Sequence, residues 1–373
     1  MAGLYIHIPF CKQACNYCDF HFSTNQEGRK QLCEAIAKEL SLQIKYLEGE
    51  KLETIYFGGG TPSLLSPDEL AIIFAAIYKN YTVADDAEIT LEANPDDLSK
   101  EKLIELKLAG INRLSIGIQS FQDDVLKSFN RAHNAKESVE CIALAREAGF
   151  TNLSLDLIYA VPDQDLNRWR KNIEQAIALN PEHISAYSLT IEQKTAFGQW
   201  QKKGKLKAVG ENESAADFEL LMDVLITNGY EHYEISNFCK PGFYSKHNTS
   251  YWKQKKYLGV GPSAHSYNGD SRQSNISNNQ LYLKSIGNEL VPFEKEILTR
   301  ENKINEYIFT TLRTQWGCDL SYLETQLGYR QDKRLFQQLI DQQLLTLQGS
   351  VALLTQKGKL LADQIATDLF VSS

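Results

Sequence analysis

Three cysteines stand close together near the start of the 373-residue chain, in the segment Cys11-Lys-Gln-Ala-Cys15-Asn-Tyr-Cys18. The C-x3-C-x2-C spacing directly follows an apolar run over residues 4–8 that predicts a β-strand. Three thiolates can bind three irons of a cubane [4Fe–4S] cluster and leave the fourth iron open, whereas clusters used only for electron transfer are normally fully ligated by protein. An open iron can accept an external chelator. A zinc site and unrelated structural thiols are the two alternative interpretations.

A glycine-rich run and several isolated polar residues follow later strands. The run Gly58–Pro62 reads GGGTP and comes directly after a strand predicted over 54–57. Residues without side chains let backbone amides and carbonyls approach a charged ligand closely. The polar residues at or after the later strands are Glu92, Gln119, Arg131 and Asp156. Because the C-terminal strand ends of a parallel barrel carry its functional site, we expect these side chains to gather there.

The elements that position these residues alternate through the first half of the chain. The predicted strands are Leu4–Ile8, Thr54–Phe57, Glu88–Glu92, Arg113–Gly117, Leu153–Ile158 and Ile184–Leu189. The predicted helices lie at about 28–47, 67–80, 99–109, 135–149 and 165–179. Six strands alternating with helices indicate an α/β fold with a parallel sheet, either doubly wound or curled into a barrel.

The alternation stops near residue 190. A helix is predicted at 213–228, an aromatic and loop-rich segment follows, and after Arg300 the pattern is helical with a short hairpin at 345–354. That order is compatible with a small winged-helix-like module. We therefore expect three parts, which are a barrel over 1–230, a loop-rich linker segment over 231–295 and a C-terminal helical module over 296–373.

Composition excludes some classes of function. The 39 Lys and Arg against 47 Asp and Glu give a net charge of −8, which disfavours a nucleic-acid binder. No apolar run approaches the roughly 18 residues needed to span a bilayer, and the N-terminus lacks the pattern of a secretory signal. We expect a cytoplasmic chain without an integral membrane segment, and a peripheral membrane contact stays open.

Together these motifs resemble those of radical S-adenosylmethionine (SAM) proteins. The cysteine motif with Tyr17 before its last cysteine resembles their cluster signature, and GGGTP resembles their glycine-rich segment that receives the amino group of SAM. The resemblance implies a partial, open (β/α)6 barrel and a [4Fe–4S] cluster on Cys11, Cys15 and Cys18, with SAM chelating the open iron. In the subgroup that contains oxygen-independent coproporphyrinogen oxidase, matching positions contact SAM. Those positions are Tyr5, Gly59, Gly60, Thr61, Glu92, Gln119, Arg131 and Asp156.

Two features separate the chain from the oxidase itself. The oxidase motif continues with a fourth cysteine where this chain has Phe20, and only ten residues precede Cys11, where the oxidase carries an extension that helps close its site. A third feature is the segment His247-Asn-Thr-Ser-Tyr-Trp252, which resembles the H-N-x-x-Y-W signature of a haem-chaperone family in this subgroup. Imidazole is a good axial ligand for haem iron, and two aromatic rings offer flat apolar surface beside a porphyrin.

We therefore expect His247 to contact haem from a flexible segment, with a loop histidine packed on the barrel rim as the alternative. His265, which we place near SAM, and Cys239 are further haem candidates. The resemblance implies a chaperone that binds haem and hands it to an unknown acceptor protein, without coproporphyrinogen oxidase activity and with no assigned catalytic residue. The cluster and exchangeable SAM would then be structural or regulatory. The alternative is a radical enzyme, supplied by an electron donor, that acts on a porphyrinogen or on a substrate methylated with SAM.

Overall fold

Six parallel strands form the first half of the computed structural model, which describes residues 2–371. They are β1 (Ala2–Ile8), β2 (Leu52–Gly59), β3 (Val83–Ala93), β4 (Arg113–Gln119), β5 (Leu153–Tyr159) and β6 (His183–Ser188). Each strand pairs in parallel with the next, but β1 and β6 do not pair with each other. The expectation of a partial, open (β/α)6 barrel is therefore confirmed.

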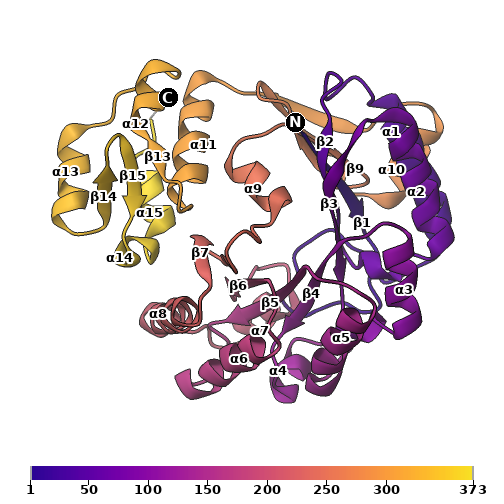
Figure 1. Ribbon diagram of the computed structural model, residues 1–373, viewed down its shortest axis with the longest axis horizontal. Helices are drawn as coiled ribbons and strands as arrows, with labels where there is room; N and C mark the ends of the chain where they lie inside the picture. Colours follow the sequence, from indigo (N-terminus) through magenta and orange to yellow (C-terminus); the bar gives the residue numbers. More distant parts are fainter. Residues whose placement is uncertain (1, 372–373) are drawn as a thin grey trace.

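Helices cover the convex face of this curved sheet (Figure 1). They are α1 (Arg29–Leu42), α2 (Pro67–Asn80), α3 (Lys100–Leu108), α4 (Asp123–Ser128), α5 (Ala135–Glu147), α6 (Leu166–Ala178) and α8 (Glu211–Thr227). Helix α2 shows how local sequence fixes a boundary, because Ser66 accepts from the Glu69 amide while the Glu69 side chain accepts from the Ser66 amide. The main core lies between these helices and the apolar strand faces.

The segment over 231–295, expected to be a loop-rich linker, instead extends the same sheet at both edges. Its strands are β7 (Glu231–Glu234), β8 (Asn237–Cys239), β9 (Tyr257–Val260), β10 (His265–Tyr267), β11 (Ser271–Asn275) and β12 (Phe293–Ile297). The full order is β12-β11-β10-β9-β1-β2-β3-β4-β5-β6-β8-β7. The prediction failed because these strands are only three to five residues long, and β12 is exposed along its whole length.

A buried carboxylate fastens the extension to the barrel. Glu39 of α1 is 0% exposed and accepts hydrogen bonds from the Gly261 amide at 2.8 Å and from Asn275 Nδ2 at 2.7 Å. The Tyr282 hydroxyl of α10 (Asn279–Gly287) donates to the same carboxylate. Burial raises the pKa of Glu39, so these donors are needed to hold its charge in the core.

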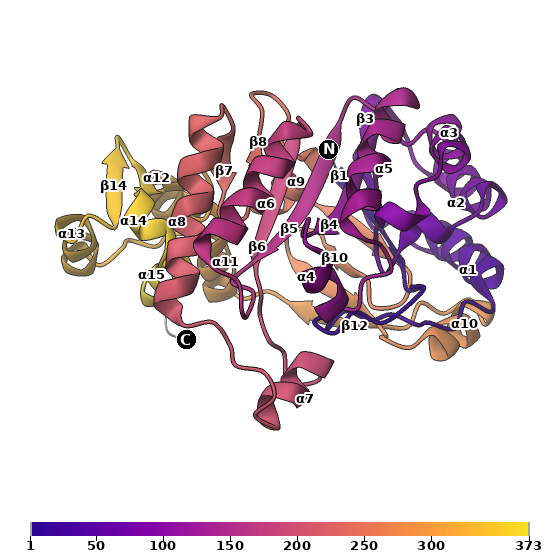
Figure 2. The same ribbon diagram turned by 90° about the horizontal axis from the view of Figure 1, so that it is seen from below.

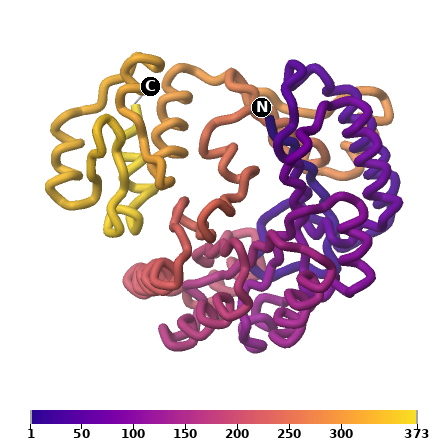
Figure 3. The backbone as a smooth tube through the Cα atoms, in the orientation of Figure 1, coloured from indigo at the N-terminus to yellow at the C-terminus, as the bar shows by residue number. Residues whose placement is uncertain are grey.

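The C-terminal module has its own hydrophobic core. Its elements are α11 (Arg300–Leu312), β13 (Cys318–Asp319), α12 (Leu320–Thr325), α13 (Lys333–Asp341), β14 (Leu345–Gln348), β15 (Val351–Leu354), α14 (Gln356–Lys359) and α15 (Ala362–Asp368). The strands form one antiparallel sheet. This confirms the expected helical module with a short hairpin, which Figure 3 shows as a separate yellow lobe beside the barrel.

Two short helices occupy particular places around the barrel. Helix α9 (Lys246–Trp252) lies on the concave side of the sheet, between the barrel and the C-terminal module (Figure 1). Helix α7 (Ala196–Lys202) projects from the body on an excursion after β6 (Figure 2). Within residues 2–371, no helix combines the length and apolar character that crossing a membrane requires.

Candidate metal and cofactor site

The three clustered cysteines lie on a loop that leaves the end of β1. The loop is tied down on both sides by hydrogen bonds that need no metal. The Cys11 amide donates to the Ser23 carbonyl at 3.0 Å, and Asn16 uses its amide and its side chain to bond the carbonyls of Phe129 and Ser128. The excursion carrying α7 adds a bond from the Phe197 amide to the Asn16 carbonyl at 2.9 Å. The loop is therefore preorganised.

The chemistry of this loop fits a cluster with several irons. All three thiols are free and half-buried, and burial raises the pKa of Cys18 to about 11, with Cys15 and Cys11 adding to the shift. A positive group lies beside them, since Arg131 Nη1 is 3.4 Å from Cys15 Sγ. Among residues 2–371 no three His, Cys, Asp or Glu side chains converge on a single-ion position. Three half-buried thiols beside a positive group are a donor set that a four-iron cluster can use, with each thiolate on a different iron.

The glycine run is required by the protein's own packing. Gly59 has φ +107, and a Cβ there would lie 2.5 Å from the His7 ring. A Cβ on Gly60 would lie 2.6 Å from the Phe10 carbonyl oxygen. The amides of Gly60 and Thr61 bond the carbonyls of Ile8 and Phe10 at 2.8 and 2.7 Å. These glycines therefore let β2 and its following turn lie against the chain that leads into Cys11, and their expected approach to a ligand stays a prediction.

Two half-buried carboxylates, Glu92 and Asp156, stand on the inner face of the barrel. Glu92 accepts from Tyr56 Oη at 2.8 Å and from the Gly59 amide at 3.1 Å, and burial raises its pKa to about 7. Asp156 accepts from Ser115 Oγ at 3.2 Å, and burial raises its pKa to about 6. A cationic ligand beside these carboxylates would stabilise their charged forms and so lower both pKa values.

Arg131 links the polar strand ends to the cysteine loop. Its Nη2 donates to Asn94 Oδ1 at 2.6 Å and to the Gly117 carbonyl at 2.8 Å, while its Nε has no hydrogen-bond partner in the described chain. Gln119, at the end of β4, has φ +64, an unusual conformation for a residue with a side chain. A Cβ on Gly117 would lie 2.9 Å from Gln119 Nε2, so Gln119 and Arg131 crowd the same glycine. Thr61 completes the group, since its Oγ1 accepts from Asn94 Nδ2 at 3.3 Å and its side chain bonds Cys11.

Tyr5 lies deeper in the barrel, on β1. Its hydroxyl is 3.1 Å from His7 Nδ1, and its ring stacks on Tyr56 with centroids 6.1 Å apart. Through Tyr56 it is connected to Glu92. The residues expected to bind the cluster and SAM therefore form one contiguous group at the C-terminal strand ends.

His247 does not lie where the sequence suggested. The expected flexible segment is helix α9, and the imidazole is 1% exposed inside the barrel. Its Nδ1 bonds Thr54 Oγ1 at 2.8 Å and its Nε2 bonds Tyr251 Oη at 2.7 Å, while its ring stacks on Tyr56 with centroids 4.8 Å apart. Both ring nitrogens are thus engaged, and burial lowers the His247 pKa to about 3. Ligation of haem iron by this residue would require α9 to open.

The other haem candidates differ in exposure. His265 begins β10 and is exposed, and it lies near enough to His7 to lower the His7 pKa electrostatically. Cys239 is 0% exposed in β8. Trp252, the last residue of the sequence motif, packs against Arg313 of the C-terminal module at 5.0 Å. The motif therefore serves as a junction between the barrel and that module.

Sequence reasoning missed a buried charged pair between β3 and β4. Arg113, 1% exposed, lies 4.0 Å from the Glu88 carboxylate, and that carboxylate accepts from the amides of Lys246 and His247 at 3.1 Å. The pair holds the first turn of α9 to the barrel. The sequence feature that could have revealed this pair is the arginine at the start of the apolar run RLSIGI.

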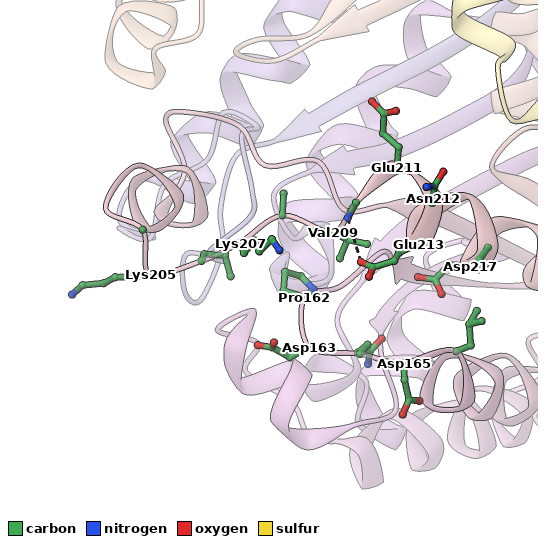
Figure 4. A pocket seen from close by; sticks show the side chains of 17 residues that line it. Pro162, Asp163, Asp165, Lys205, Lys207, Val209, Glu211, Asn212, Glu213 and Asp217 are labelled. Carbon is green, nitrogen blue, oxygen red and sulfur yellow. Dashed lines mark hydrogen bonds between the residues drawn. The ribbon is translucent and has the colours of Figure 1, made fainter.

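A wide groove lies apart from this site. Its volume is about 1230 Å³, and it runs between the loop after β5 and the segment before α8 (Figure 4). Five acidic side chains line it against two lysines, so its lining is net negative. These residues are Asp163, Asp165, Glu211, Glu213, Asp217, Lys205 and Lys207. No cysteine and none of the expected SAM residues is among them.

Comparisons with known proteins agree with the geometry. A family model described as the radical SAM superfamily matches residues 5–176, and one described as the HemN C-terminal domain matches residues 298–361. The solved structure of coproporphyrinogen III oxidase (HemN) from Escherichia coli shares the fold, with a TM-score of 0.86 at 24% identity over 99% of this chain and 90% of that one. The barrel and its three-cysteine loop are thus those of a radical SAM protein, a superfamily that implies a [4Fe–4S] cluster and SAM.

Curated relatives narrow the assignment. The heme chaperone HemW of Bacillus subtilis is 37% identical over 371 residues, which is 98% of each chain. The heme chaperone HemW of Lactococcus lactis is 37% identical over 95% of this chain and 93% of its own length. The chain therefore belongs to the HemW family.

Proposed function

We propose that this protein binds haem and transfers it to an acceptor protein, and that it carries a [4Fe–4S] cluster with exchangeable SAM at the C-terminal end of its barrel. The observation that carries the proposal is the similarity to heme chaperones named HemW over 98% of both chains. The preorganised loop of Cys11, Cys15 and Cys18 supports the cluster assignment.

In this proposal the three cysteines hold the cluster and the neighbouring strand ends hold SAM. Arg131 offsets thiolate charge beside Cys15 and fixes the loop to β4. Glu92 and Asp156, with pKa values raised by burial, supply negative charge that a sulfonium and an ammonium group would satisfy. Tyr5, Gly59, Gly60, Thr61 and Gln119 line or shape the same end. When bound, the cluster can supply the electron that cleaves SAM.

Phe20 supports a role other than that of the oxidase. It stands at the position of the oxidase's fourth cysteine, and its side chain is 72% exposed and offers no metal ligand. We expect no conversion of coproporphyrinogen by the reconstituted protein. Measurable decarboxylation of that substrate would favour the alternative, a radical enzyme acting on a porphyrinogen.

The proposal is tested by haem binding and haem release on the same anaerobically reconstituted sample. Absorbance titration should show saturable binding of haem, and apomyoglobin, used as a haem trap, should then take up the bound haem. The cluster-free protein should bind haem but release it to apomyoglobin at a different rate. A reconstituted protein that binds no haem would refute the proposal.

A further inference from the structure

A second cavity lies at the opposite end of the barrel from the cysteine loop. Its volume is about 380 Å³. Its walls come from the N-terminal ends of β1, β2 and β3, from one side of α9, and from the C-terminal module. The residues that matter for the argument are Phe243, Tyr244, Lys246, Thr249, Lys253 and Trp316.

One wall of this cavity is aromatic. Tyr244 and Trp316 meet edge to face with centroids 5.7 Å apart, and Phe243 beside them is 38% exposed. Such rings offer apolar surface to the face or edge of a flat macrocycle. The cavity is small enough that a porphyrin would keep part of its surface outside, which suits a cargo that must be released.

The charges around the cavity leave one lysine without a carboxylate. Lys246 pairs with Asp86 at 3.2 Å and Lys255 pairs with Glu53 at 3.2 Å. In contrast, Lys253 Nζ lies 4.3 Å from the centroid of the Trp316 ring, and no carboxylate in the described chain is within ion-pair distance of it. A carboxylate on a ligand lying against Trp316 would reach this ammonium group.

Two buried polar atoms in the lining also lack partners. Thr249 Oγ1, on α9, and Asn152 Oδ1, before β5, are shielded from solvent and make no hydrogen bond with the rest of the described chain. Buried polar atoms are nearly always paired, so each unpaired one calls for an explanation. Because solvent does not reach these atoms, a ligand would pair with them only after the lining shifts, and docking would depend on the aromatic wall and on Lys253.

We infer that this cavity, which we call the α9 pocket, is where haem docks, held by its flat face and its propionates and not by iron ligation from His247. The inference rests on the proposed function, since it places the cargo of that function. The wide acidic groove of Figure 4 does not suit haem, because its net negative lining would repel the propionates. Haem and SAM would then occupy opposite ends of the barrel and could be bound together.

The test compares three ligands on the full-length, cluster-loaded protein under anaerobic conditions. Haem and iron-free protoporphyrin IX should bind with similar affinity, because the iron makes no bond to the protein. Protoporphyrin IX dimethyl ester, which lacks the charged propionates, should bind about tenfold more weakly. Much weaker binding of iron-free protoporphyrin than of haem would overturn the inference in favour of axial ligation.

Variants locate the site. Lys253→Glu and Trp316→Ala should each raise the haem dissociation constant about tenfold, while the controls Lys171→Glu and Trp200→Ala, both at exposed positions outside the pocket, should not change it. Lys253→Glu changes an exposed side chain, so it tests the site even if Trp316→Ala folds poorly. If the wild type binds haem and Lys253→Glu binds it equally well, the α9 pocket is not the site. If the wild type binds no haem, the proposed function fails together with this inference.

Discussion

The two ends of the barrel treat their buried polar groups differently. One end carries Cys11, Cys15 and Cys18 at the C-terminal ends of the strands, and we call it the cysteine end. There, burial raises the pKa of Glu92 to about 7 and that of Asp156 to about 6, and Arg131 Nε has no hydrogen-bond partner in the described chain. Around α9, which we call the α9 end, His247 is 1% exposed and both of its ring nitrogens are hydrogen-bonded within the protein. The first arrangement leaves charge for a ligand to satisfy, whereas the hydrogen-bonding capacity of the His247 ring is used up within the protein. A chemically capable side chain is therefore a ligand-binding residue only where the fold leaves its bonding capacity open.

The largest effect should come from removing the thiols of the cysteine end. Replacing Cys11, Cys15 and Cys18 together by Ala should abolish bound iron and sulfide while the fold persists, because the loop is held by bonds that need no metal. Iron and sulfide assays after reconstitution measure this. Cys318→Ala in the C-terminal module is the matched control and should keep its cluster. Normal iron content in the triple variant would contradict the cluster assignment.

A smaller but still large effect is expected at Gly60. In Gly60→Ala the new Cβ would lie 2.6 Å from the Phe10 carbonyl, so the chain leading into Cys11 must shift. We expect a loss of about 1–3 kcal/mol in the free energy of unfolding of the cluster-free protein, and reduced cluster incorporation. Gly287→Ala is the control, since a Cβ there meets nothing within 4 Å. Equal urea midpoints and iron contents in the two variants would show that the close packing does not matter.

The carboxylates predict a pH dependence of stability. Because burial raises the pKa of Glu92 from 4.5 to about 7, the folded state holds a proton that the unfolded state has lost between these values. The contribution of Glu92 to stability therefore falls as pH rises from about 4.5 to about 7 and then levels off. Glu92→Gln removes this decline, so the variant should gain about 1–3 kcal/mol on the wild type between pH 5 and pH 7.5, measured by urea unfolding without SAM. A constant difference across this range would contradict the raised pKa of Glu92.

The smallest effect should come from Tyr56, which touches both regions. Tyr56→Phe removes the hydroxyl that donates to Glu92 but keeps the ring that stacks on His247. We expect a loss of about 1 kcal/mol in the free energy of unfolding, together with a further rise in the Glu92 pKa. Tyr56→Ala removes the ring as well and should cost several times more. Similar losses in the two variants would mean that the ring contributes nothing to the α9 end.

The sequence predicted the cysteine end well because its signals are local. The C-x3-C-x2-C spacing, the GGGTP run and polar residues closing successive apolar strands are each readable from a few neighbouring letters, and parallel topology then brings them together. Even so, the steric reason for Gly59 and Gly60 depends on His7 and Phe10, which lie about 50 residues earlier, and only the structure shows those contacts.

The α9 end could not be predicted in the same way because its contacts are distant in sequence. His247 bonds Thr54, which lies 193 residues away, and α9 begins against the Glu88 carboxylate of β3. The strands around it are short and polar, so neither their periodicity nor their pairing with β1 is visible in the letters. An imidazole followed by two aromatic residues therefore suggested a ligand, although the fold uses it for packing.

The most direct test of this contrast compares Glu92→Gln with His247→Ala. For each variant, calorimetry gives the SAM dissociation constant and thermal unfolding gives the melting temperature. Glu92→Gln should lose roughly ten- to hundredfold in SAM affinity without melting at a lower temperature than the wild type, because it alters a group awaiting a ligand. His247→Ala should keep its SAM affinity within a few-fold and melt at a clearly lower temperature, because it removes two buried hydrogen bonds and a stacked ring. A His247→Ala protein that melts like the wild type, or a Glu92→Gln protein that binds SAM like the wild type, would contradict the account.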